Sequence, residues 1–361
     1  MKTKQDDLQD EFSKEFIAKG FKGLAYLCPR FGKIKFTLNC LKKTDSVLVV
    51  YPEVSIKNSW QTDIKKWKFK GKVDYSTSMS FKKIRKVYDV LVIDEIHLLS
   101  EAQIQAVSEY LYNTGIKKVI GLSGTLSDDT QAKLSASLGL DVLVEYSISQ
   151  AIIDGVICDY KIDVVYVPLS TVPNIKVTWK GGEFMTSEKS SFDYITNKIN
   201  ISHSSKLKML RLLRMSMIKK SKAKIAATQL ILKTLLHKRV LVFTGLIEVA
   251  ESLGIPTYHS KSKSDIAKDS FIMGNSNKLA VVKQLNTGVT FKSLDTAIIN
   301  FFDSNSENMA QKISRITCKE MFNEGKVAHI VIICSTEEIE KKWLMKSLSF
   351  FDSDKINFIN P

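Results

Sequence analysis

The segment VLVIDEIHLLS, residues 90–100, is the most informative part of this chain for its fold class. Its four apolar residues lead directly into the carboxylates of Asp94 and Glu95. A short β-branched run of this kind is typical of a strand buried on both faces of a parallel sheet. Because open α/β sheets bind ligands at the carboxyl ends of their strands, we expect both acids to face a ligand. An ordinary strand end with two exposed acids is the alternative.

Apolar runs of the same kind recur on both sides of this segment, separated by longer amphipathic stretches such as residues 101–112. Strands that alternate with helices in this way predict a doubly wound α/β domain with a parallel sheet. A second series of runs after residue 161 predicts a second α/β domain. The predicted strands are residues 47–51, 90–93, 119–122, 164–167, 239–243, 279–282, 296–300 and 329–334.

We place the domain boundary within residues 145–161 and predict domains at residues 1–147 and 148–361. Residues 176–236 depart from the α/β pattern, because a predicted hairpin turn at Gly181–Gly182 is followed by a long helical region rich in Lys and Arg. That region is either a solvated basic face on a core-packed helix or an inserted helical segment that binds phosphates. The predicted fold class is therefore α/β, with two tandem domains and a basic helical insertion in the second half.

The composition restricts the class of protein. The chain has 361 residues, which suits about two domains, and a formal net charge of +15. Such a charge points to nucleic acid or an anionic membrane, although a basic protein without either ligand is the alternative. No apolar run approaches the roughly 20 residues that span a membrane, and the N-terminus lacks the apolar stretch of a secretory signal. Five scattered cysteines without a CxxC pair favour neither a zinc site nor disulfides, and fit a cytoplasmic location.

A candidate phosphate-binding loop lies in CPRFGKIKF, residues 28–36. Gly32 would let the backbone approach a phosphate, the following helix would offer free N–H groups, and Lys33 would add positive charge. The usual loop has an upstream glycine and a Ser or Thr after the lysine, but this chain has Leu27 and Ile34 at those positions. Alone the pattern is weak, and a Gly-Lys pair in a surface turn is the alternative.

The two acids follow this loop by about 60 residues, and the combination favours a nucleotide site. Asp94 could orient Mg²⁺, and Glu95 could polarise a water for attack on a γ-phosphate. His97 stands beside them and could couple this site to the other domain. After the next predicted strand, the hydroxyls of Ser123 and Thr125 could bond the acids or bridge to the partner domain. A plain strand-to-helix turn explains those hydroxyls nearly as well.

The order of these segments resembles superfamily 2 helicases and translocases of the DEAD/DEAH-like type. The Gly-Lys pair, DEIH and SGT are similar to motifs I, II and III of that family. The ordered set covers nearly the whole chain and is similar in type to compact bacteriophage helicases and to the motor subunits of restriction systems. The remaining motif-like segments are residues 47–67 (Ia), 73–81 (Ib), 239–253 (IV), 285–299 (V) and 311–318 (VI).

The resemblance implies two RecA-like domains that hydrolyse ATP with Mg²⁺ while they move on or unwind nucleic acid, DNA being favoured over RNA. Lys33 would contact the β- and γ-phosphates, Asp94 would hold the metal and Glu95 would be the catalytic base. Arg315 and Gln311 would reach the nucleotide from the second domain. The implied nucleotide-binding residues are Pro29, Arg30, Phe31, Gly32, Lys33, Ile34 and Gly288. The implied nucleic-acid contacts, mostly to phosphate, are Pro52, Thr77, Thr244, His259, Ser260 and Thr287. The implied coupling residues are His97, Ser123 and Thr125.

Two departures from the family pattern bear on activity. Ile34 lacks the hydroxyl that helps coordinate Mg²⁺, so a water or Thr37 would have to compensate. In the motif VI segment, Ser314 and Cys318 replace the usual Gly and final Arg, and such an arginine finger is worth about 10³–10⁵ in rate. We therefore expect slow hydrolysis, with Arg315, another basic side chain or a protein partner supplying the charge. The alternative is a degenerate, non-hydrolysing nucleic-acid-binding module. A phage origin would place the protein in a bacterial host cytoplasm.

Overall fold

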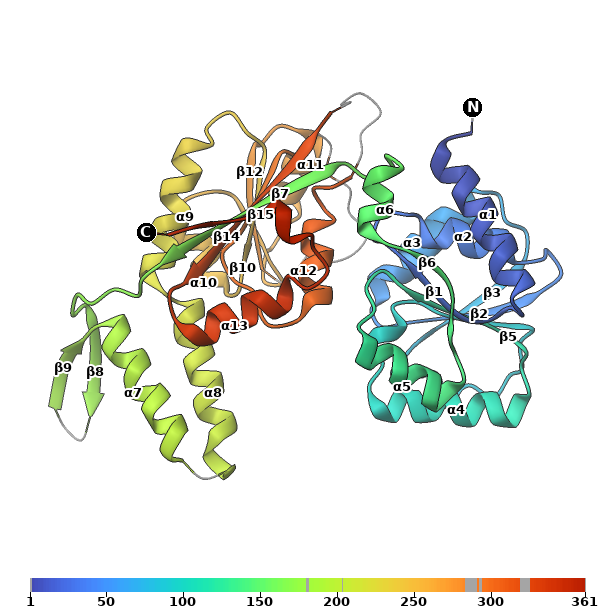
Figure 1. Cartoon of the computed structure of the whole chain (residues 1–361), viewed down its shortest axis with the longest axis horizontal. Helices are drawn as coiled ribbons and strands as arrows, with labels where there is room; N and C mark the ends of the chain where they lie inside the picture. Colours follow the sequence, from blue (N-terminus) through green and yellow to red (C-terminus); the bar gives the residue numbers. More distant parts are fainter. Residues whose placement is uncertain are drawn as a thin grey trace. The chain divides into compact units, whose positions relative to one another are not determined.

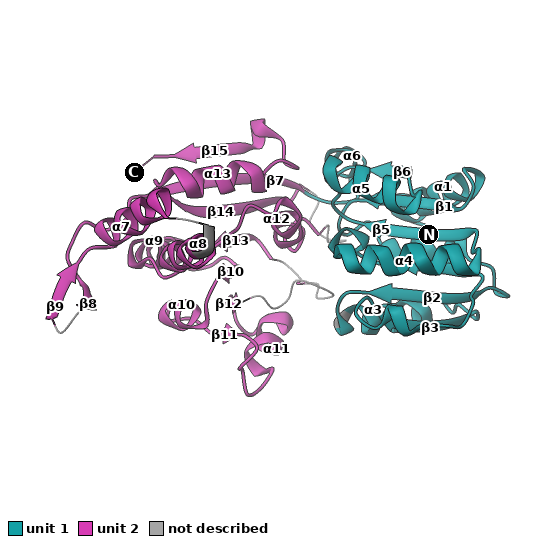
Figure 2. Ribbon diagram, turned by 90° about the horizontal axis from the view of Figure 1, so that it is seen from below, with its two compact units in different colours: residues 1–158, 287–289 teal, residues 159–286, 290–361 magenta. Residues whose placement is uncertain are grey.

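The computed structural model describes residues 2–179, 182–202, 204–282, 291, 294–318 and 325–360. Among these residues, those up to Cys158 form one compact unit, unit 1, and those from Asp159 onward form a second, unit 2. Figure 2 shows the two units in teal and magenta. We had placed the boundary at residues 147/148, whereas the units divide at 158/159. The difference arises because Ala151, Val156 and Ile157 pack into the core of unit 1.

Unit 1 is built on a six-stranded parallel sheet with the order β3-β2-β4-β5-β1-β6. Its central strands are rich in Val and Ile and are buried on both faces, as the apolar runs predict. Strands β1 and β4 lie on either side of β5, so the segments that follow these three strands meet at one edge of the sheet. The strands are β1 Lys22–Leu27, β2 Ser46–Tyr51, β3 Lys72–Thr77, β4 Val90–Ile93, β5 Lys118–Ser123 and β6 Val142–Tyr146.

Helices cover both faces of this sheet. Alternate residues of the central strands enter two separate cores: Val90 and Val92 pack beneath one set of helices, and Leu91 and Ile93 beneath the other. The first core includes residues from α1, α2, α3 and α6, and the second includes residues from α4 and α5. The helices are α1 Lys4–Ala18, α2 Lys33–Cys40, α3 Val54–Lys66, η1 Phe81–Lys83, η2 Ile96–Leu98, α4 Glu101–Thr114, α5 Asp128–Leu138 and α6 Ile148–Ile153.

Unit 2 contains a seven-stranded parallel sheet with the order β11-β12-β10-β13-β14-β7-β15 (Figure 1). Its C-terminal strand β15 pairs with β7, and Phe358 stacks on Tyr166 at a ring-centroid distance of 6.1 Å. The strands are β7 Asp159–Val167, β10 Val240–Thr244, β11 Thr257–Tyr258, β12 Lys278–Val282, β13 Thr296–Ile299, β14 Val327–Ser335 and β15 Ile356–Ile359. The helices outside the inserted segment are α9 Lys222–Thr234, α10 Ile247–Ser252, α11 Ile266–Met273, α12 Ser306–Ile313, α13 Glu338–Ser347 and η3 Ser353–Lys355.

The helical insertion, which we define as the segment between Ser170 and Ser221, extends from one end of unit 2 (Figure 1). It contains the antiparallel hairpin of β8 (Ile175–Trp179) and β9 (Gly182–Thr186), followed by α7 (Glu188–Ile201) and α8 (Ser204–Lys219). The Glu188 carboxylate fastens its two ends, because it accepts hydrogen bonds from Ser170 N at 3.3 Å, Ser221 Oγ at 3.0 Å and Lys222 N at 2.5 Å.

The insertion was predicted at residues 176–236, but in the structure it ends near Ser221, before helix α9. Helix α9 packs onto the sheet instead, and its Leu232 is buried in one core with Val240 and Val242. Lys224 on the same helix is buried and forms an ion pair with Glu340. The run of basic residues therefore crosses from the insertion into α9, which is a core-packed helix, and phosphate binding by the inserted segment stays a prediction.

The described residues contain neither a membrane-spanning helix nor a cluster of metal-binding side chains. None of their helices combines the length and apolarity that crossing a membrane requires. None of their His, Cys, Asp and Glu side chains gather in a group of three or more that could hold a metal ion by themselves.

Candidate functional site

The phosphate-binding loop predicted at residues 28–36 connects β1 to α2 in unit 1. Gly32 is the residue before α2 and has φ +88°, a left-handed conformation that favours glycine. A Cβ atom at this position would run into the side-chain amide of Gln9. No side chain among the described residues caps the first turn of α2, whose N–H groups can therefore receive an anion.

Helix α1 holds the backbone of this loop from behind. Gln5 Nε2 donates to the carbonyl of Phe31 at 2.7 Å and to that of Arg30 at 3.1 Å, and Gln9 Nε2 donates to the Phe31 carbonyl at 2.6 Å. Gln9 is only 3% exposed. Sequence reasoning missed both glutamines, because an amide that bonds a carbonyl more than 20 residues away leaves no local pattern.

Phe31, which the resemblance assigned to nucleotide binding, has a structural role here. Its ring is fully buried and packs against Phe12 and Tyr146, at ring-centroid distances of 5.7 Å and 4.8 Å. Its N–H donates to the carbonyl of Cys28 at 3.2 Å, and its own carbonyl accepts from α1. No group of Phe31 is left for a phosphate, so we remove it from the proposed site. Pro29, Arg30, Gly32 and Ile34 remain partly exposed in the loop.

Lys33 and the two acids come together at the carboxyl edge of the sheet. Lys33 Nζ lies 2.5 Å from Glu95 Oε1 and 4.0 Å from Asp94 Oδ1. A Cβ atom on Gly124, just beyond β5, would lie 3.5 Å from the same Nζ, so Lys33 crosses the end of β5 to reach β4. Burial alone would lower the pKa of Lys33, but the negative charges of Glu95 and Asp94 outweigh it and raise that pKa.

The Asp94 carboxylate is buried and held by two donors. Its Oδ2 accepts from the indole N–H of Trp60 at 2.8 Å, and its Oδ1 accepts from the backbone N–H of Glu95 at 3.0 Å. Burial raises the pKa of Asp94, while Lys33 opposes that shift. Trp60 lies on α3 and is fully buried, so it is a core residue that also orients the Asp94 carboxylate.

Glu95 has φ +50° and leads into the short helix η2, which carries His97. His97 Nδ1 lies 2.9 Å from Ser123 Oγ and 3.6 Å from Glu95 Oε2. Burial lowers the pKa of His97 to about 4, so the ring is neutral at pH 7. Ser123 thus bonds His97 rather than the acids, while Thr125 Oγ1 is buried with no hydrogen-bond partner among the described residues.

Thr37 does not replace the hydroxyl that Ile34 lacks. It is fully buried, and its hydroxyl donates to the backbone carbonyl of Lys33 at 2.9 Å. The donor set for a magnesium ion in unit 1 is therefore the Asp94 carboxylate, with Glu95 beside it. This set fits Mg²⁺, which proteins commonly bind through one or two carboxylates while water and substrate phosphates complete its shell.

Arg315 and Gln311 belong to unit 2. Gln311 lies on α12 and is partly exposed, and its carbonyl accepts from Ser314 Oγ at 2.8 Å. Arg315 lies just beyond the end of α12 and is 5% exposed. That these two side chains reach the nucleotide, and that His97 couples the domains, remain predictions.

The predicted nucleic-acid contacts fall into two groups. Pro52 and Thr77 lie at or just beyond the carboxyl ends of β2 and β3 and are partly exposed, and Ser260 is exposed beyond β11. Thr244 is buried with its hydroxyl directed at the carbonyls of Leu246 and Val281, at 3.2 Å and 3.3 Å.

The His259 ring is also buried; it accepts from Lys261 N at 3.3 Å and lies 3.5 Å from Glu251. We therefore do not include the Thr244 hydroxyl and the His259 ring among the proposed nucleic-acid contacts, because both are buried and already interact with neighbouring residues of unit 2. Thr287 and Gly288 lie outside the described residues.

Solved structures with this arrangement include three instructive examples. The ATP-dependent Type ISP restriction-modification enzyme LlaBIII, bound to DNA, matches all of this chain at 13% identity with a TM-score of 0.64. This chain spans only 31% of that enzyme. Dbp5 of S. cerevisiae, bound to RNA and ADP BeF3, matches 97% of this chain and 89% of its own at 10% identity and a TM-score of 0.58.

The Pyrococcus furiosus Hef helicase domain matches 94% of this chain and 97% of its own, at 12% identity with a TM-score of 0.54. By sequence, the chain matches no protein-family model and no curated protein. The chain shares the fold of these solved structures, with two RecA-like α/β domains in tandem. At these identities the likeness establishes the fold, and function has to be argued from the site. A bacteriophage origin stays a prediction.

Proposed function

We propose that this protein is a nucleic-acid-dependent ATPase of the helicase or translocase type. The observation that carries the proposal is the contact of Lys33 Nζ with Glu95 at 2.5 Å, beside Asp94 at 4.0 Å, at one edge of the sheet. A lysine at a helix N-terminus can bind phosphate, while paired carboxylates at the neighbouring strand end can hold magnesium and activate water.

Each residue of this cluster has a separate role in the proposed reaction. Lys33 and the first-turn N–H groups of α2 bind the phosphates of ATP. The phosphate draws Lys33 away from Glu95, so the Glu95 carboxylate becomes free to accept a proton from the attacking water. Asp94, oriented by Trp60, holds magnesium, which when bound neutralises charge on the phosphates. The neutral His97 and Ser123 fix the segment that carries Glu95.

The second domain and the nucleic acid complete the proposal. Arg315 and Gln311 approach the nucleotide from unit 2, and Gly288 and Thr287 join the nucleotide and strand sites. Pro52, Thr77 and Ser260 contact the strand, chiefly through its phosphates. Among the proteins of the same fold, LlaBIII is bound to DNA and Dbp5 to RNA and ADP BeF3, which supports a nucleotide and a nucleic acid as ligands. We favour DNA over RNA.

A second candidate function follows from the missing hydroxyl and the missing arginine. Ile34 is partly buried against the core, and the hydroxyl of Thr37 donates to the Lys33 carbonyl within its own helix. Cys318 stands at the arginine-finger position of the motif VI segment. Such a site could bind ATP as a clamp without turnover, in a nucleic-acid-binding module that keeps the helicase architecture. Salt-sensitive strand binding without phosphate release would identify it.

An ATPase assay with four separate stimulators tests the proposal. Single-stranded and double-stranded DNA and RNA are each added to the wild-type protein with Mg²⁺-ATP, and phosphate release is followed. We expect at least one of them to stimulate hydrolysis, and Lys33→Ala to abolish both basal and stimulated rates. Lys117→Ala, at an exposed position away from the loop, is the matched control. If the wild-type protein releases no phosphate with any of the four nucleic acids, the ATPase proposal is contradicted. The non-hydrolysing clamp is then the function that the site supports.

A further inference from the structure

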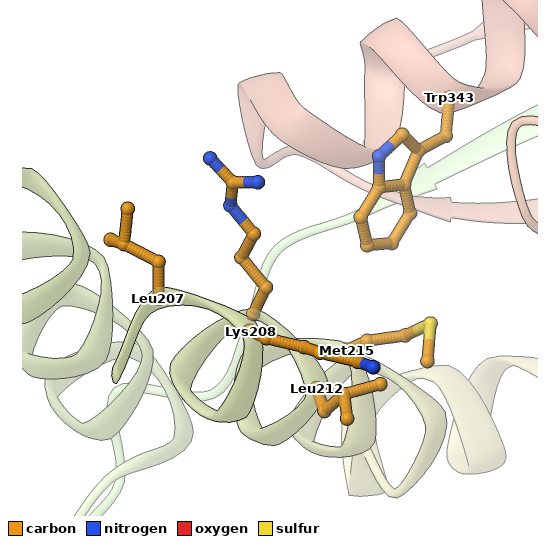
Figure 3. A pocket seen from close by; sticks show the side chains of 6 residues that line it. Leu207, Lys208, Leu212, Met215 and Trp343 are labelled. Atoms are coloured by element: carbon orange, nitrogen blue, oxygen red, sulfur yellow. The ribbon is translucent and has the colours of Figure 1, made fainter. Parts of the chain in front are cut away.

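A groove lies between helix α8 of the insertion and helix α13 of unit 2. Its volume is about 510 Å³, within the usual range of ligand sites. Trp343 projects from α13 toward α8, and Leu212 and Met215 form the facing wall (Figure 3). Two basic side chains, Lys208 and Arg211, line it as well, so an aromatic ring and positive charges share one open groove.

The charge around this groove is unusual within the chain. Residues 194–247 contain twelve of the 53 Lys and Arg residues and no Asp or Glu. The rest of the chain then has 41 basic residues against 38 acidic ones, which is close to neutral. Most of the +15 net charge is thus concentrated in the insertion and the segment that follows it, and a polyanion is the ligand that such a concentration attracts.

The positive charges on α8 lack local compensation. Among the described residues, no carboxylate forms an ion pair with Lys206, Lys208, Arg211 or Arg214, whereas the exposed Lys2, Lys86 and Lys176 each have one. Arg214 Nε is buried and has no hydrogen-bond partner in the described part of the chain. Burial and the charge of Arg211 together lower the pKa of Arg214. An anion beside α8 would relieve this repulsion.

The ring of Trp343 is supported from behind and partly exposed in front. It packs against a small core of Leu169, Phe192 and Ile218, which joins the insertion to the body of unit 2. The indole is therefore held in place before any ligand arrives, and Lys342 beside it is exposed. A preorganised aromatic face next to uncompensated cations is the combination by which proteins bind single strands.

We propose that this groove binds a single-stranded segment of nucleic acid, with one base stacked on Trp343 and the adjoining phosphates at Lys208 and Arg211. The proposal rests on the proposed function, because it adds a strand-binding subsite to that ATPase. Charge selects this occupant over an apolar peptide helix, since uncompensated cations flank the groove on α8. A stacked base is sequence-tolerant, so the subsite would hold any strand that the motor engages.

The stacking contact is tested by replacing Trp343. Binding of a fluorescein-labelled oligothymidylate is measured by anisotropy without nucleotide. We expect Trp343→Ala to raise Kd by roughly 5- to 150-fold, the range for loss of one stacked base, and Trp343→Phe to retain most of the affinity. Tyr112→Ala removes an aromatic ring that is 89% exposed and is the matched control. Wild-type affinity in Trp343→Ala would overturn the proposal.

The phosphate contacts are tested by a double charge reversal. Lys208→Glu with Arg211→Glu changes two exposed residues, so the fold should be unaffected. Lys14→Glu with Lys117→Glu makes the same change in net charge at exposed positions of unit 1. We expect the first pair to lower the slope of log Kd against log salt by about 1.4, twice the single-strand value per phosphate, and the second to leave it nearly unchanged. Equal effects of the two pairs would indicate a general charge effect and overturn the subsite.

A photocrosslink separates this proposal from the proposed function. An oligonucleotide that carries 5-iodouracil is irradiated with the full-length protein, and the modified peptide is identified by mass spectrometry. We expect modification of Trp343. The proposed subsite is contradicted if the crosslinks map to other residues or if the protein binds no strand. It is also contradicted if an acidic amphipathic peptide binds in the groove and the strand does not. If Trp343 is modified while no ATP is hydrolysed, the subsite stands and the ATPase proposal fails.

Discussion

The indole N–H of Trp60 lies 2.8 Å from Asp94 Oδ2, and both groups are buried. We expect Trp60→Phe to keep the packing and lose this hydrogen bond, so that Asp94 holds magnesium less well. Groups that orient a metal ligand typically contribute about 10- to 100-fold to metal affinity or activity. The measurement is the Mg²⁺ concentration at half-maximal ATPase rate, with Trp67→Phe as the control. A purely structural role for Trp60 would change stability and leave that Mg²⁺ midpoint where it was.

His97 should make stability depend on pH in a defined window. Its folded pKa of about 4 lies below the ordinary 6.5, because the buried ring resists protonation. The unfolded chain therefore binds the extra proton first, and stability falls as pH drops from 6.5 toward 4. At pH 5 this costs roughly 2 kcal/mol.

In His97→Gln that contribution is absent. Urea unfolding at pH 7 and pH 5 should thus show a smaller loss for the variant than for the wild type. Glu95 and Lys33, which face the ring, are present in both proteins, so their contributions largely cancel in the comparison. An equal loss in the two proteins would contradict the buried, neutral state of His97.

Single residues also show what the sequence can and cannot predict. Lys33, Asp94 and Glu95 were predicted to form one nucleotide site from the Gly-Lys pair and the strand end at residues 90–93, and their side chains do meet. The hydrogen bond between Trp60 and Asp94 could not be predicted, because it depends on the angle at which α3 crosses the sheet. Thr37 was, beside a water, one alternative for the hydroxyl that Ile34 lacks, and Thr244 was an implied nucleic-acid contact. Both hydroxyls instead donate hydrogen bonds to backbone carbonyls, one in a helix and one in a strand, and the spacing of residues in the sequence could not reveal this.

Helix α1 gives the phosphate-binding loop its shape through Gln5 and Gln9. We expect Gln9→Leu to remove one of the two side-chain hydrogen bonds to the Phe31 carbonyl, at a cost of about 0.5–1.5 kcal/mol in unfolding free energy, because Gln5 still donates the other. Binding of a fluorescent ATP analogue should weaken as the loop loosens. Gln105→Leu replaces an exposed glutamine on α4 and is the control. Unchanged affinity in Gln9→Leu would mean that α1 contributes to folding without shaping the site.

Elements differ in how well the sequence predicted them. Eight strands of the two sheets were predicted, seven of them to within two residues, because β-branched runs between helical segments rarely form anything except buried strands. Strand β7 begins five residues before its predicted start, and β1, β3, β6, β11 and β15 were not predicted. The end of the insertion was misplaced, since α8 and α9 are both basic, with five and three Lys and Arg residues and no acidic ones, and this composition does not separate a projecting helix from a core helix. Helix α1 was not predicted, because its sequence is mostly polar, and two of its three buried residues, Gln9 and Ser13, are polar as well.

The two units have separate cores, and nucleotide should stabilise only one of them. We expect calorimetry to show the transition of unit 1 moving up with Mg²⁺ and a non-hydrolysable ATP analogue. At a ligand concentration of 100 Kd the stabilisation is about 2.7 kcal/mol. Lys33→Ala should abolish this shift and leave the transition of unit 2 in place. A shift that survives in Lys33→Ala would mean that the nucleotide binds elsewhere.

For the molecule as a whole, the sequence predicted two α/β domains and a polyanion partner from independent features, the strand pattern and the charge. The tandem fold is confirmed by the two parallel sheets and by solved structures of the same architecture. The groove at Trp343 could not be predicted, because α8 and α13 are more than 100 residues apart in the chain.

Glu95→Gln offers the sharpest test that the Lys33–Asp94–Glu95 cluster hydrolyses ATP. The substitution keeps the shape of the side chain and removes its ability to accept a proton. In single-turnover experiments with radiolabelled ATP and a stimulating strand, the variant should bind ATP about as tightly as the wild type and hydrolyse it at least about 100-fold more slowly. Hydrolysis by Glu95→Gln at the wild-type rate would show that the chemistry occurs elsewhere and would contradict this assignment.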